Sequence, residues 1–349
     1  MYHNMNAFFY GFQFPHHGRF TAFSALSKGL EQIGIPVFRT SFPSFLDHKG
    51  LRRFMRLWFQ VNEYRLRPHF SDGSLVHYFF PENSLFRAPK WKKDGKLVLS
   101  CHQPYEQMAR ARSEGKRVPF FEGLRAADAV VLMASCEIEA YRTFAPDSEI
   151  LCIPHGVDTD FFFPGQSPLP PDGCFKVLTV GNCLRDYELW AKVVERVVSD
   201  NPYVNFTVIA NPDRIDLATR NLTTGPRNVR TLHGISDEQL RSEYQRADII
   251  FLPLVNAWAN NALLEALACG KAVVITDLPA TREYGGAAAC YVEKGSVAAA
   301  AEALLRLGAD SDARSILGWD ARQRVEAQFS WKRIAEQHRS LYQRLNQKS

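Results

Sequence analysis

The sequence predicts an α/β protein with two domains, each built on an open parallel β-sheet that is covered by helices. Three observations point to this fold class. The chain has 349 residues, enough for two domains of about 150 residues each. Short apolar runs alternate with amphipathic stretches, which is typical of parallel strands connected by helices. A stretch rich in proline and glycine at residues 165–173 interrupts this alternation and is typical of a linker.

The first half of the chain has the pattern of one β/α array. Its first strand is expected at residues 8–12, and residues 21–33 follow as a helix with apolar side chains at helical spacing. Further strand-like runs occupy residues 75–80, 96–101, 129–133 and 150–153. We therefore expect an N-terminal domain over residues 1–164.

The alternation restarts after the linker. Strands are expected at residues 175–180, 206–209, 229–232, 248–254 and 272–276. Residues 236–239 have the form of a capping box, which begins a helix. A second domain over residues 174–328 and a final helix over residues 329–349 follow from this pattern. Because open parallel sheets bind ligands beyond the carboxyl ends of their strands, the functional site is expected in a cleft between the domains.

Composition and charge exclude several classes of protein. With 46% hydrophobic and 23% charged residues, the chain is globular rather than disordered, collagen-like or coiled-coil. A net charge of +5 is too small to indicate nucleic-acid binding. The seven cysteines form no Cys-x-x-Cys motif, which argues against a zinc ribbon or a disulfide framework. We find neither a secretory signal nor a membrane-spanning run, so a cytoplasmic protein is expected.

Four segments carry a recognisable pattern. They are residues 153–164 (IPHGVDTDFFFP), 232–253, 259–274 (ANNALLEALACGKAVV) and 329–334 (FSWKRI). In this order and spacing they resemble glycosyltransferase family 4, whose members are retaining sugar-nucleotide transferases of the GT-B fold. The resemblance implies two Rossmann-like domains that face each other across a cleft, with the C-terminal helix crossing back to the first domain.

The same resemblance implies that the second domain binds a nucleotide-diphosphate sugar, UDP- or GDP-linked, and that the first domain binds the acceptor. It implies no cofactor and no protein-bound metal ion. Asp158 and Asp160 have the spacing of a metal-binding Asp-x-Asp motif, but an interdomain turn is the simpler interpretation of this segment.

Glu265 matches a family glutamate that binds the ribose hydroxyls of the nucleotide. A carboxylate suits two vicinal hydroxyls because both of its oxygens accept hydrogen bonds. The alternative is a surface glutamate, yet its neighbours in the sequence are apolar. A second family glutamate, eight residues earlier, is replaced by Ala257, and the nearby polar candidates are Asn256, Asn260 and Asn261. The backbone N–H groups of Asn260 and Asn261, at a helix start, can also bind an anionic donor group.

The loop after the first strand of the second domain is the expected diphosphate site, because a strand end followed by a helix start leaves N–H groups for an anion. The family often places an arginine directly after Gly181. Here that position is Asn182, and Arg185 is the available cation. Arg185 could instead pair with Asp186 or Glu188 on the surface.

Two positions in the first domain also match the family. Gly18 lies in the first strand-to-helix loop, where a missing side chain lets the backbone approach the donor phosphate. His102 follows the strand expected at residues 96–101 and corresponds to a histidine that contacts the donor sugar. A histidine that is merely hydrogen-bonded at a strand end is the alternative.

Residues 49–70 combine basic and apolar side chains, with Glu63 as their single acid. A basic amphipathic helix of this kind can lie on an anionic membrane or receive a lipid-linked acceptor. The alternative is a helix that packs Phe54, Leu57 and Trp58 inward and leaves a solvated basic face.

These features predict a glycosyltransferase that is independent of metal ions. Arg185 and helix N-terminal amides would stabilise the departing diphosphate, and a donor phosphate oxygen would accept the acceptor proton. Glu265 would anchor the ribose and His102 would orient the sugar. Two other functions stay open: a nucleotide-sugar-binding protein without transfer activity, and a dinucleotide-dependent oxidoreductase. The second would need a Gly-x-Gly-x-x-Gly loop, where the chain has Gly18 alone.

Overall fold

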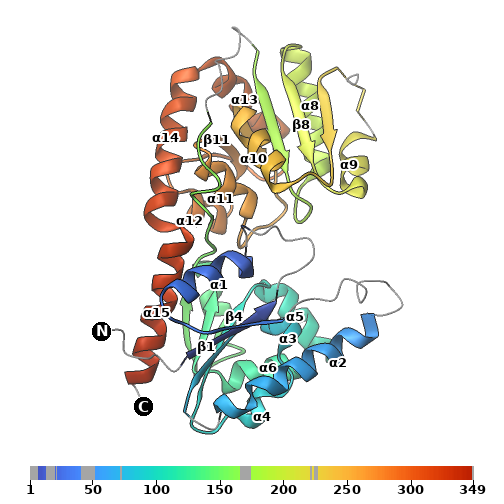
Figure 1. Ribbon diagram of the computed structural model, residues 1–349. Helices are drawn as coiled ribbons and strands as arrows, with labels where there is room; N and C mark the ends of the chain where they lie inside the picture. Colours follow the sequence, from blue (N-terminus) through green and yellow to red (C-terminus); the bar gives the residue numbers. More distant parts are fainter. Residues whose placement is uncertain are drawn as a thin grey trace. The chain divides into compact units, whose positions relative to one another are not determined.

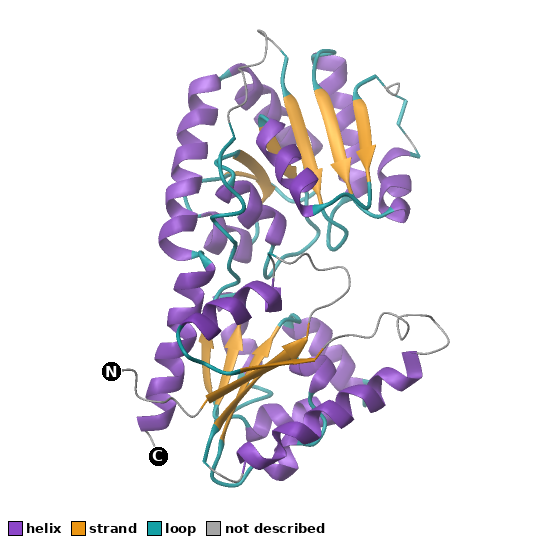
Figure 2. Ribbon diagram, in the orientation of Figure 1, coloured by secondary structure: helices purple, strands orange, loops and turns teal. Residues whose placement is uncertain are grey.

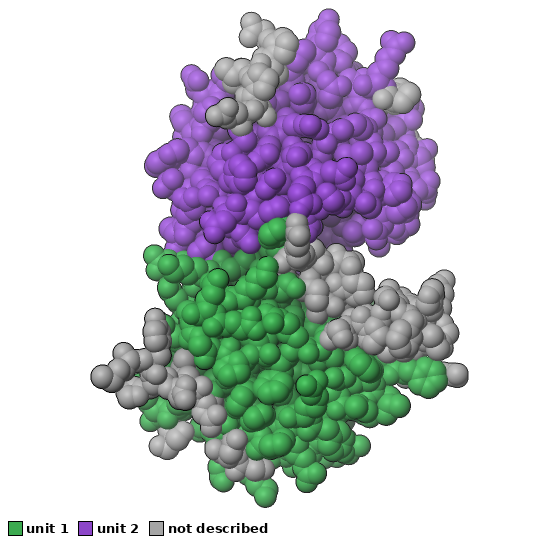
Figure 3. Space-filling model, in the orientation of Figure 1, with its two compact units in different colours: residues 1–156, 331–349 green, residues 157–330 purple. Residues whose placement is uncertain are grey.

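Figure 1 shows the computed structural model of the protein, which describes residues 7–12, 20, 22–40, 52–70, 73–165, 174–220, 222–223 and 227–347. The chain divides into two compact units (Figure 3): unit 1 is Met1–Gly156 with Trp331–Ser349, and unit 2 is Val157–Ser330. In both units the strands form one sheet with helices packed against it (Figure 2). Of the linker expected at residues 165–173, all but Gly165 lies outside the described residues.

Unit 1 contains a six-stranded parallel sheet in the order β2-β1-β3-β4-β5-β6. Its strands are β1 (Ala7–Phe12), β2 (Val37–Thr40), β3 (Leu75–Phe79), β4 (Lys96–Cys101), β5 (Ala129–Leu132) and β6 (Glu149–Cys152). Its α-helices are α1 (Ala22–Gln32), α2 (Arg52–Glu63), α3 (Pro81–Ser84), α4 (Ala88–Trp91), α5 (Tyr105–Ser113), α6 (Val118–Ala126), α7 (Ile138–Tyr141) and α15 (Trp331–Gln347), with 3-10 helices η2 (Tyr64–Phe70) and η3 (Ser135–Glu137). The strand order reverses between β1 and β3, and ligands of such sheets bind where this reversal opens a crevice.

Unit 2 contains a second six-stranded parallel sheet, in the order β12-β11-β10-β7-β8-β9. Its strands are β7 (Lys176–Val180), β8 (Asn205–Ile209), β9 (Val229–Leu232), β10 (Ile249–Leu252), β11 (Ala272–Thr276) and β12 (Cys290–Val292). Its helices are α8 (Tyr187–Asp200), α9 (Pro212–Thr219), α10 (Asp237–Arg246), α11 (Asn261–Ala268), α12 (Pro279–Gly285), α13 (Val297–Ala309) and α14 (Ser311–Gln328). Here the strand order reverses between β7 and β10, which predicts the ligand-binding edge of this unit.

The two parallel sheets confirm the predicted α/β fold class. The edge strands β2 and β12 are the elements that the sequence pattern does not predict. They are four and three residues long. No helix in the described part of the chain is long and apolar enough to cross a membrane.

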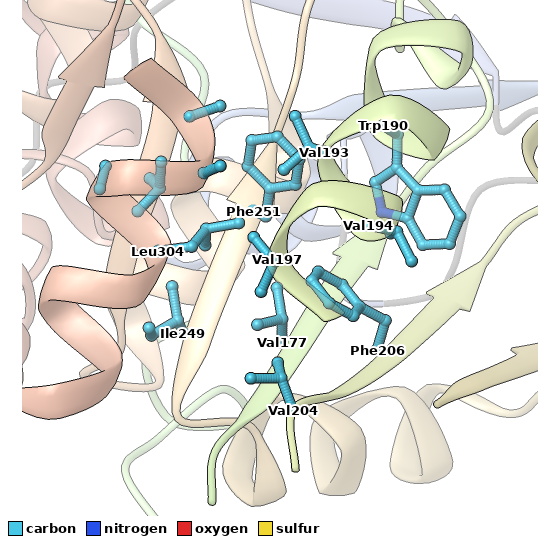
Figure 4. Close-up of a cluster of buried hydrophobic side chains, with 14 of the residues drawn as sticks. Val177, Trp190, Val193, Val194, Val197, Val204, Phe206, Ile249, Phe251 and Leu304 are labelled. Atoms are coloured by element: carbon cyan, nitrogen blue, oxygen red, sulfur yellow. The ribbon is translucent and has the colours of Figure 1, made fainter. Parts of the chain in front are cut away.

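The core of unit 2 packs helices α8 and α13 against the sheet (Figure 4). Trp190 of α8 is fully buried, and its indole N–H donates to the hydroxyl of Thr179 at 2.9 Å. That hydroxyl in turn donates to the carbonyl of Phe251 at 2.8 Å. The bonds join α8, β7 and β10, so this core holds the two strands at the order reversal in one position.

Helix α2 and the residue after it present apolar side chains to solvent. Phe54, Leu57, Val61 and Tyr64 are 43%, 57%, 58% and 48% exposed. Their spacing of three or four residues places them on one face of the helix. The alternative in which Phe54, Leu57 and Trp58 pack inward is therefore wrong for Phe54 and Leu57, while Trp58 is partly buried. The inward face is instead formed by Phe59, which is buried, and by its neighbours on that side.

Glu63, the acid at the end of α2, is buried and ties α2 to the rest of unit 1. Its carboxylate accepts hydrogen bonds from the N–H groups of Phe86, Arg87 and Ala88 at 2.8–3.1 Å, where α4 begins. The hydroxyl of Tyr78 donates to the same carboxylate at 3.2 Å. Glu63, the single acid of residues 49–70, therefore lies on the inner side of α2.

The C-terminal helix α15 belongs to unit 1, as the resemblance implied. Its anchor is a buried polar cluster: His77 of β3 bonds the hydroxyls of Tyr342 at 2.5 Å and Ser100 at 2.8 Å. His338 of α15 stacks on His77, with ring centroids 5.3 Å apart. Burial lowers the pKa of His77, and it lowers the pKa of His338 to about 4. Both rings therefore stay neutral at physiological pH.

We expect His338→Leu to stabilise the protein relative to the wild type as the pH falls. The unfolded chain protonates its histidines near pH 6.5, whereas the folded chain holds His338 neutral to about pH 4. The wild type therefore loses about 1.4 kcal/mol per pH unit between these values, and the leucine variant does not. Denaturant unfolding at pH 7.5 and pH 5 should show a relative shift of about 2 kcal/mol. Replacement of the exposed His233 is the control, and an equal gap at both pH values would contradict the prediction.

Candidate functional site

The loop of residues 181–186, between β7 and α8, lies at the order reversal of unit 2. Gly181 has φ +119°, a conformation that residues with side chains rarely adopt. A Cβ at this position would lie 2.7 Å from a guanidinium nitrogen of Arg185. Glycine is thus required here so that the side chain of Arg185 can fold back over the loop.

The guanidinium of Arg185 joins this loop to the start of α11. Its Nε donates to the carbonyl of Val180 at 2.8 Å, and its Nη1 donates to the carbonyl of Cys183 at 3.2 Å. Its Nη2 donates to the side-chain oxygen of Asn260 at 3.3 Å. Burial lowers the pKa of Arg185 below its usual value. These bonds use three of the five guanidinium N–H groups, so that, as far as the described residues show, two can donate to an anionic ligand.

Asn182 and Asp186 shape the same loop. Asn182 is exposed, and its side-chain oxygen accepts the N–H of Asn211 at 2.6 Å, just before α9. Asp186 is the N-cap of α8, and its carboxylate accepts the N–H of Leu189 at 2.9 Å. Both side chains fix backbone at the carboxyl edge of the sheet.

The start of α11 is the second part of the site. Asn260 is its N-cap and is buried; its side-chain oxygen accepts the N–H of Leu263 at 3.1 Å as well as the bond from Arg185. Asn261 is the first residue of the helix. Because the first N–H groups of a helix have no intrahelical partner, those of Asn261 and the next residue can bind an anion. Asn256, another candidate, accepts the N–H of Ala257 at 2.8 Å.

Glu265 lies in α11 and is 5% exposed, so the alternative of a surface glutamate is excluded. The hydroxyl of Tyr244, in α10, donates to its Oε2 at 2.9 Å. Burial raises the pKa of Glu265 to about 8, and the nearby Arg185 lowers it only in part. Without a ligand the carboxyl is therefore largely protonated at pH 7. Hydroxyls or a cation beside it would favour the ionised form.

His102 follows the end of β4 in unit 1. Its ring lies against the rings of Phe79 and Phe80, with centroids 4.2 Å and 4.1 Å away. Its backbone N–H donates to a carboxylate oxygen of Glu82. The N–H of Gln103 donates to the same oxygen at 3.1 Å.

Glu82 is the residue in this region that the sequence analysis does not single out. It lies in α3, directly after β3, and is 7% exposed. The sequence signal that could have found Glu82 is an acid shortly after a predicted strand, at the carboxyl end of the sheet. An acid at such a position is ordinary on a surface, and burial alone makes it unusual here.

Gly18, the predicted glycine of the first strand-to-helix loop, lies outside the described residues. Asp158 accepts the N–H groups of Asp160 and Phe161 at 3.1 Å and 2.9 Å, which makes it part of a turn. Within the described residues, no group of three or more His, Cys, Asp or Glu is placed to hold a metal ion.

The structure therefore brings Arg185, Asn260 and Glu265 together at the carboxyl edge of unit 2. Asn182 borders the same loop and Asn261 begins the same helix. His102 belongs to the other unit. The guanidinium of Arg185, the first N–H groups of α11 and the buried carboxyl of Glu265 can together bind a ligand that carries both anionic and hydroxyl groups.

Unit 2 is similar to a known family of proteins. Residues 175–310 match the model of the family described as Glycosyl transferases group 1. A curated relative, the D-inositol 3-phosphate glycosyltransferase of Corynebacterium jeikeium, is 28% identical over 232 residues. That match covers 60% of this chain and 54% of the relative, so the chain spans about half the length of the curated protein it matches.

Solved structures share the fold over nearly the whole chain. Sucrose-phosphate synthase from Thermosynechococcus elongatus has a TM-score of 0.73 at 18% identity, over 98% of this chain and 100% of that one. Anabaena HepE in complex with UDP and glucose has a TM-score of 0.70 at 14% identity, over 97% and 99%. An E. coli trehalose-6-phosphate protein bound with UDP-2-fluoro glucose has a TM-score of 0.74 at 11% identity, over 96% and 98%. The chain has the GT-B fold of these proteins.

We expect Arg185→Lys to destabilise unit 2, because an ammonium group cannot reach Val180, Cys183 and Asn260 at once. Loss of two hydrogen bonds costs roughly 1–3 kcal/mol. Thermal unfolding should report a lower Tm for this variant. Arg196→Lys is the control, because Arg196 is exposed and pairs with Asp200 on the same helix, and such pairs contribute little. Equal Tm values for the two variants would contradict the role assigned to Arg185.

Proposed function

We propose that the protein is a retaining glycosyltransferase of family 4. It transfers a sugar from a UDP- or GDP-linked donor to an acceptor hydroxyl without a protein-bound metal ion. The observation that carries this proposal is the buried Glu265 beside Arg185 and Asn260, at the carboxyl edge of a unit that matches the group 1 glycosyltransferase model. Retention follows from the family resemblance.

In this mechanism the chain's own groups stabilise the departing diphosphate. The two remaining N–H groups of Arg185 and the first N–H groups of α11 bind its oxygens, because they point to the same edge of the sheet. Glu265 binds the ribose hydroxyls, and its ionised form is stabilised when those hydroxyls donate to it. A donor phosphate oxygen accepts the proton of the acceptor hydroxyl, while His102 orients the sugar.

A nucleotide-sugar-binding protein without transfer activity is the second candidate. It is favoured by Ala257, which stands where the resembled family has an acid near the sugar.

The two functions differ in whether the protein turns over the nucleotide-sugar donor. Incubation with radiolabelled UDP-glucose or GDP-mannose should release free nucleoside diphosphate if the protein is a transferase, with faster release when an acceptor pool is added. Tight binding without release would support the second candidate.

We expect Glu265→Gln to weaken nucleotide binding about ten- to hundredfold, because hydrogen bonds to a charged group contribute roughly 1.5–3 kcal/mol. Calorimetric titration with UDP and GDP measures this directly. Glu302→Gln, on the exposed side of α13, is the matched control. An unchanged affinity in the Glu265 variant would remove Glu265 from the donor site.

We expect transfer activity to survive an excess of EDTA. Arg185 and the backbone N–H groups supply the positive charge that a divalent cation would otherwise provide. Donor turnover with and without the chelator is the measurement. Complete loss in EDTA that magnesium or manganese restores would contradict metal independence and direct attention back to Asp158 and Asp160.

We also propose that residues 49–70 contact an anionic membrane surface and bring the enzyme to its acceptor. The exposed side chains of α2 and η2 support this: Phe54, Leu57, Val61 and Tyr64 can enter the interface, and Arg56, Arg65 and Arg67 of the same segment are exposed. The inward-facing Glu63 does not offset their charge. The corresponding location is the cytoplasmic face of a membrane, and the seven free cysteines fit a reducing compartment.

We expect the protein to sediment with phosphatidylglycerol vesicles at low salt and less at high salt, because exposed charges are screened over about 10 Å at 0.1 M. Two variants should reduce sedimentation without altering UDP affinity. One combines Leu57→Glu with Val61→Glu, and the other has Arg52, Arg53 and Arg56 all changed to Gln. Ile316→Glu is the control, since Ile316 is 63% exposed on α14. A wild-type protein that stays wholly in the supernatant would end the membrane proposal.

A further inference from the structure

The turn that carries His102 is held on two sides by side chains of unit 1. One oxygen of Glu82 accepts both backbone N–H groups of the turn, those of His102 and Gln103. The hydroxyl of Tyr141 donates to the carbonyl of Gln103 at 2.6 Å. The ring of His102 packs against Phe80. The turn therefore has little freedom as long as the carboxylate is in place.

The position of Glu82 requires special backbone geometry. The residue before α3, Phe80, has φ +64°, the left-handed conformation that residues with a Cβ rarely adopt. Arg117, at φ +55°, donates a hydrogen bond from its guanidinium to the carbonyl of Glu82. Two left-handed non-glycine residues thus border this acid. Such conformations cost roughly 1 kcal/mol or more each and persist where the surroundings impose them.

The second oxygen of Glu82 is buried and has no hydrogen-bond partner within the described residues. A buried carboxyl oxygen without a partner is costly for stability, since its hydration is lost and not replaced. A glutamine or an apolar residue would fill this space at lower cost if packing alone were required. The first oxygen, in contrast, accepts the backbone N–H groups of the turn that carries His102.

We propose that Glu82 is a positioning residue of the transferase: its carboxylate holds the His102–Gln103 turn so that the imidazole of His102 meets the donor sugar. This inference rests on the proposed function, in which His102 orients the sugar. A carboxylate is a stronger acceptor for two N–H groups than a neutral carboxyl. The hold on the turn is therefore tightest when Glu82 is ionised.

The surroundings of Glu82 predict the pH at which this hold weakens. Burial raises the pKa of Glu82 to about 7, while the bonds to the turn and the charge of Arg117 lower it. In the part of the chain that the structure describes, the titratable or charged groups that face it are Arg117, Cys101, His102 and Tyr141. Turnover should thus fall as the pH is lowered from 8 to 6.

The test compares Glu82→Gln with Glu63→Gln. Both acids are buried in unit 1, accept backbone N–H groups and have a raised pKa, but Glu63 holds the start of α4 instead of the turn. Three quantities are measured from pH 6 to pH 8: kcat of sugar release from UDP-glucose or GDP-mannose, the Kd for the nucleoside diphosphate, and the imidazole NMR signals of His102.

We expect Glu82→Gln to lower kcat at pH 8 about tenfold, to flatten its decrease towards pH 6, to leave the Kd within twofold and to shift the His102 signals. Glu63→Gln should keep the wild-type pH profile and His102 signals. Wild-type kcat and pH profile in Glu82→Gln, or the same changes in both variants, would overturn the proposal. If the wild type neither binds nucleotide nor releases sugar, the proposed function fails; unshifted His102 signals in Glu82→Gln would then overturn the positioning role separately.

Discussion

The guanidinium of Arg185 is the interaction on which the carboxyl edge of unit 2 depends. It bonds the end of β7, its own loop and the side chain of Asn260, which lies 75 residues away in the chain. Asn260 in turn caps α11, and α11 carries Glu265. The strand pair beneath is fixed by Trp190 and Thr179. The position of the buried carboxyl therefore follows from a connected series of hydrogen bonds and from the absence of a side chain at Gly181.

Three buried acids show how differently a carboxyl can be accommodated. Glu63 receives three backbone N–H groups and a tyrosine hydroxyl, most of them on one oxygen, and these bonds give it a structural task. Glu82 receives two N–H groups on one oxygen, and its pKa rises to about 7. Glu265 receives one hydroxyl, and its pKa rises to about 8. Where fewer groups donate hydrogen bonds to a carboxylate, less opposes the rise in pKa that burial causes. Glu82 and Glu265 are therefore the acids that can respond to a ligand.

The two faces of helix α2 lie in different surroundings. Its inner face supplies Phe59 and Glu63 to the interior of unit 1, while its outer face leaves Leu57 and Val61 in water. Apolar side chains in a row at helical spacing gain nothing from folding when they remain exposed. They do gain when a second apolar phase covers them. The arginines of the same segment favour an anionic surface.

The sequence by itself determined the fold class, because the alternation of apolar runs and amphipathic stretches is a local property that each strand and helix carries. It also placed Asn182 and Arg185 in the loop after one strand and Glu265 in the helix after another, since parallel strands bring all such connections to one edge. The edge strands β2 and β12, four and three residues long, were not predicted.

Only the tertiary structure decided what each side chain bonds to. Arg185 could have paired with an adjacent acid, and it turned inward because Gly181 leaves room for it. Glu82 carried no sequence signal beyond its place after a strand; it became notable because β3 and β4 are neighbours in the sheet and the turn after β4 lies over it. Phe54 and Leu57 faced solvent because Glu63 anchors α2 from its other side. Hydrogen bonds between residues far apart in the chain depend on three-dimensional packing, and a one-dimensional pattern does not contain that information.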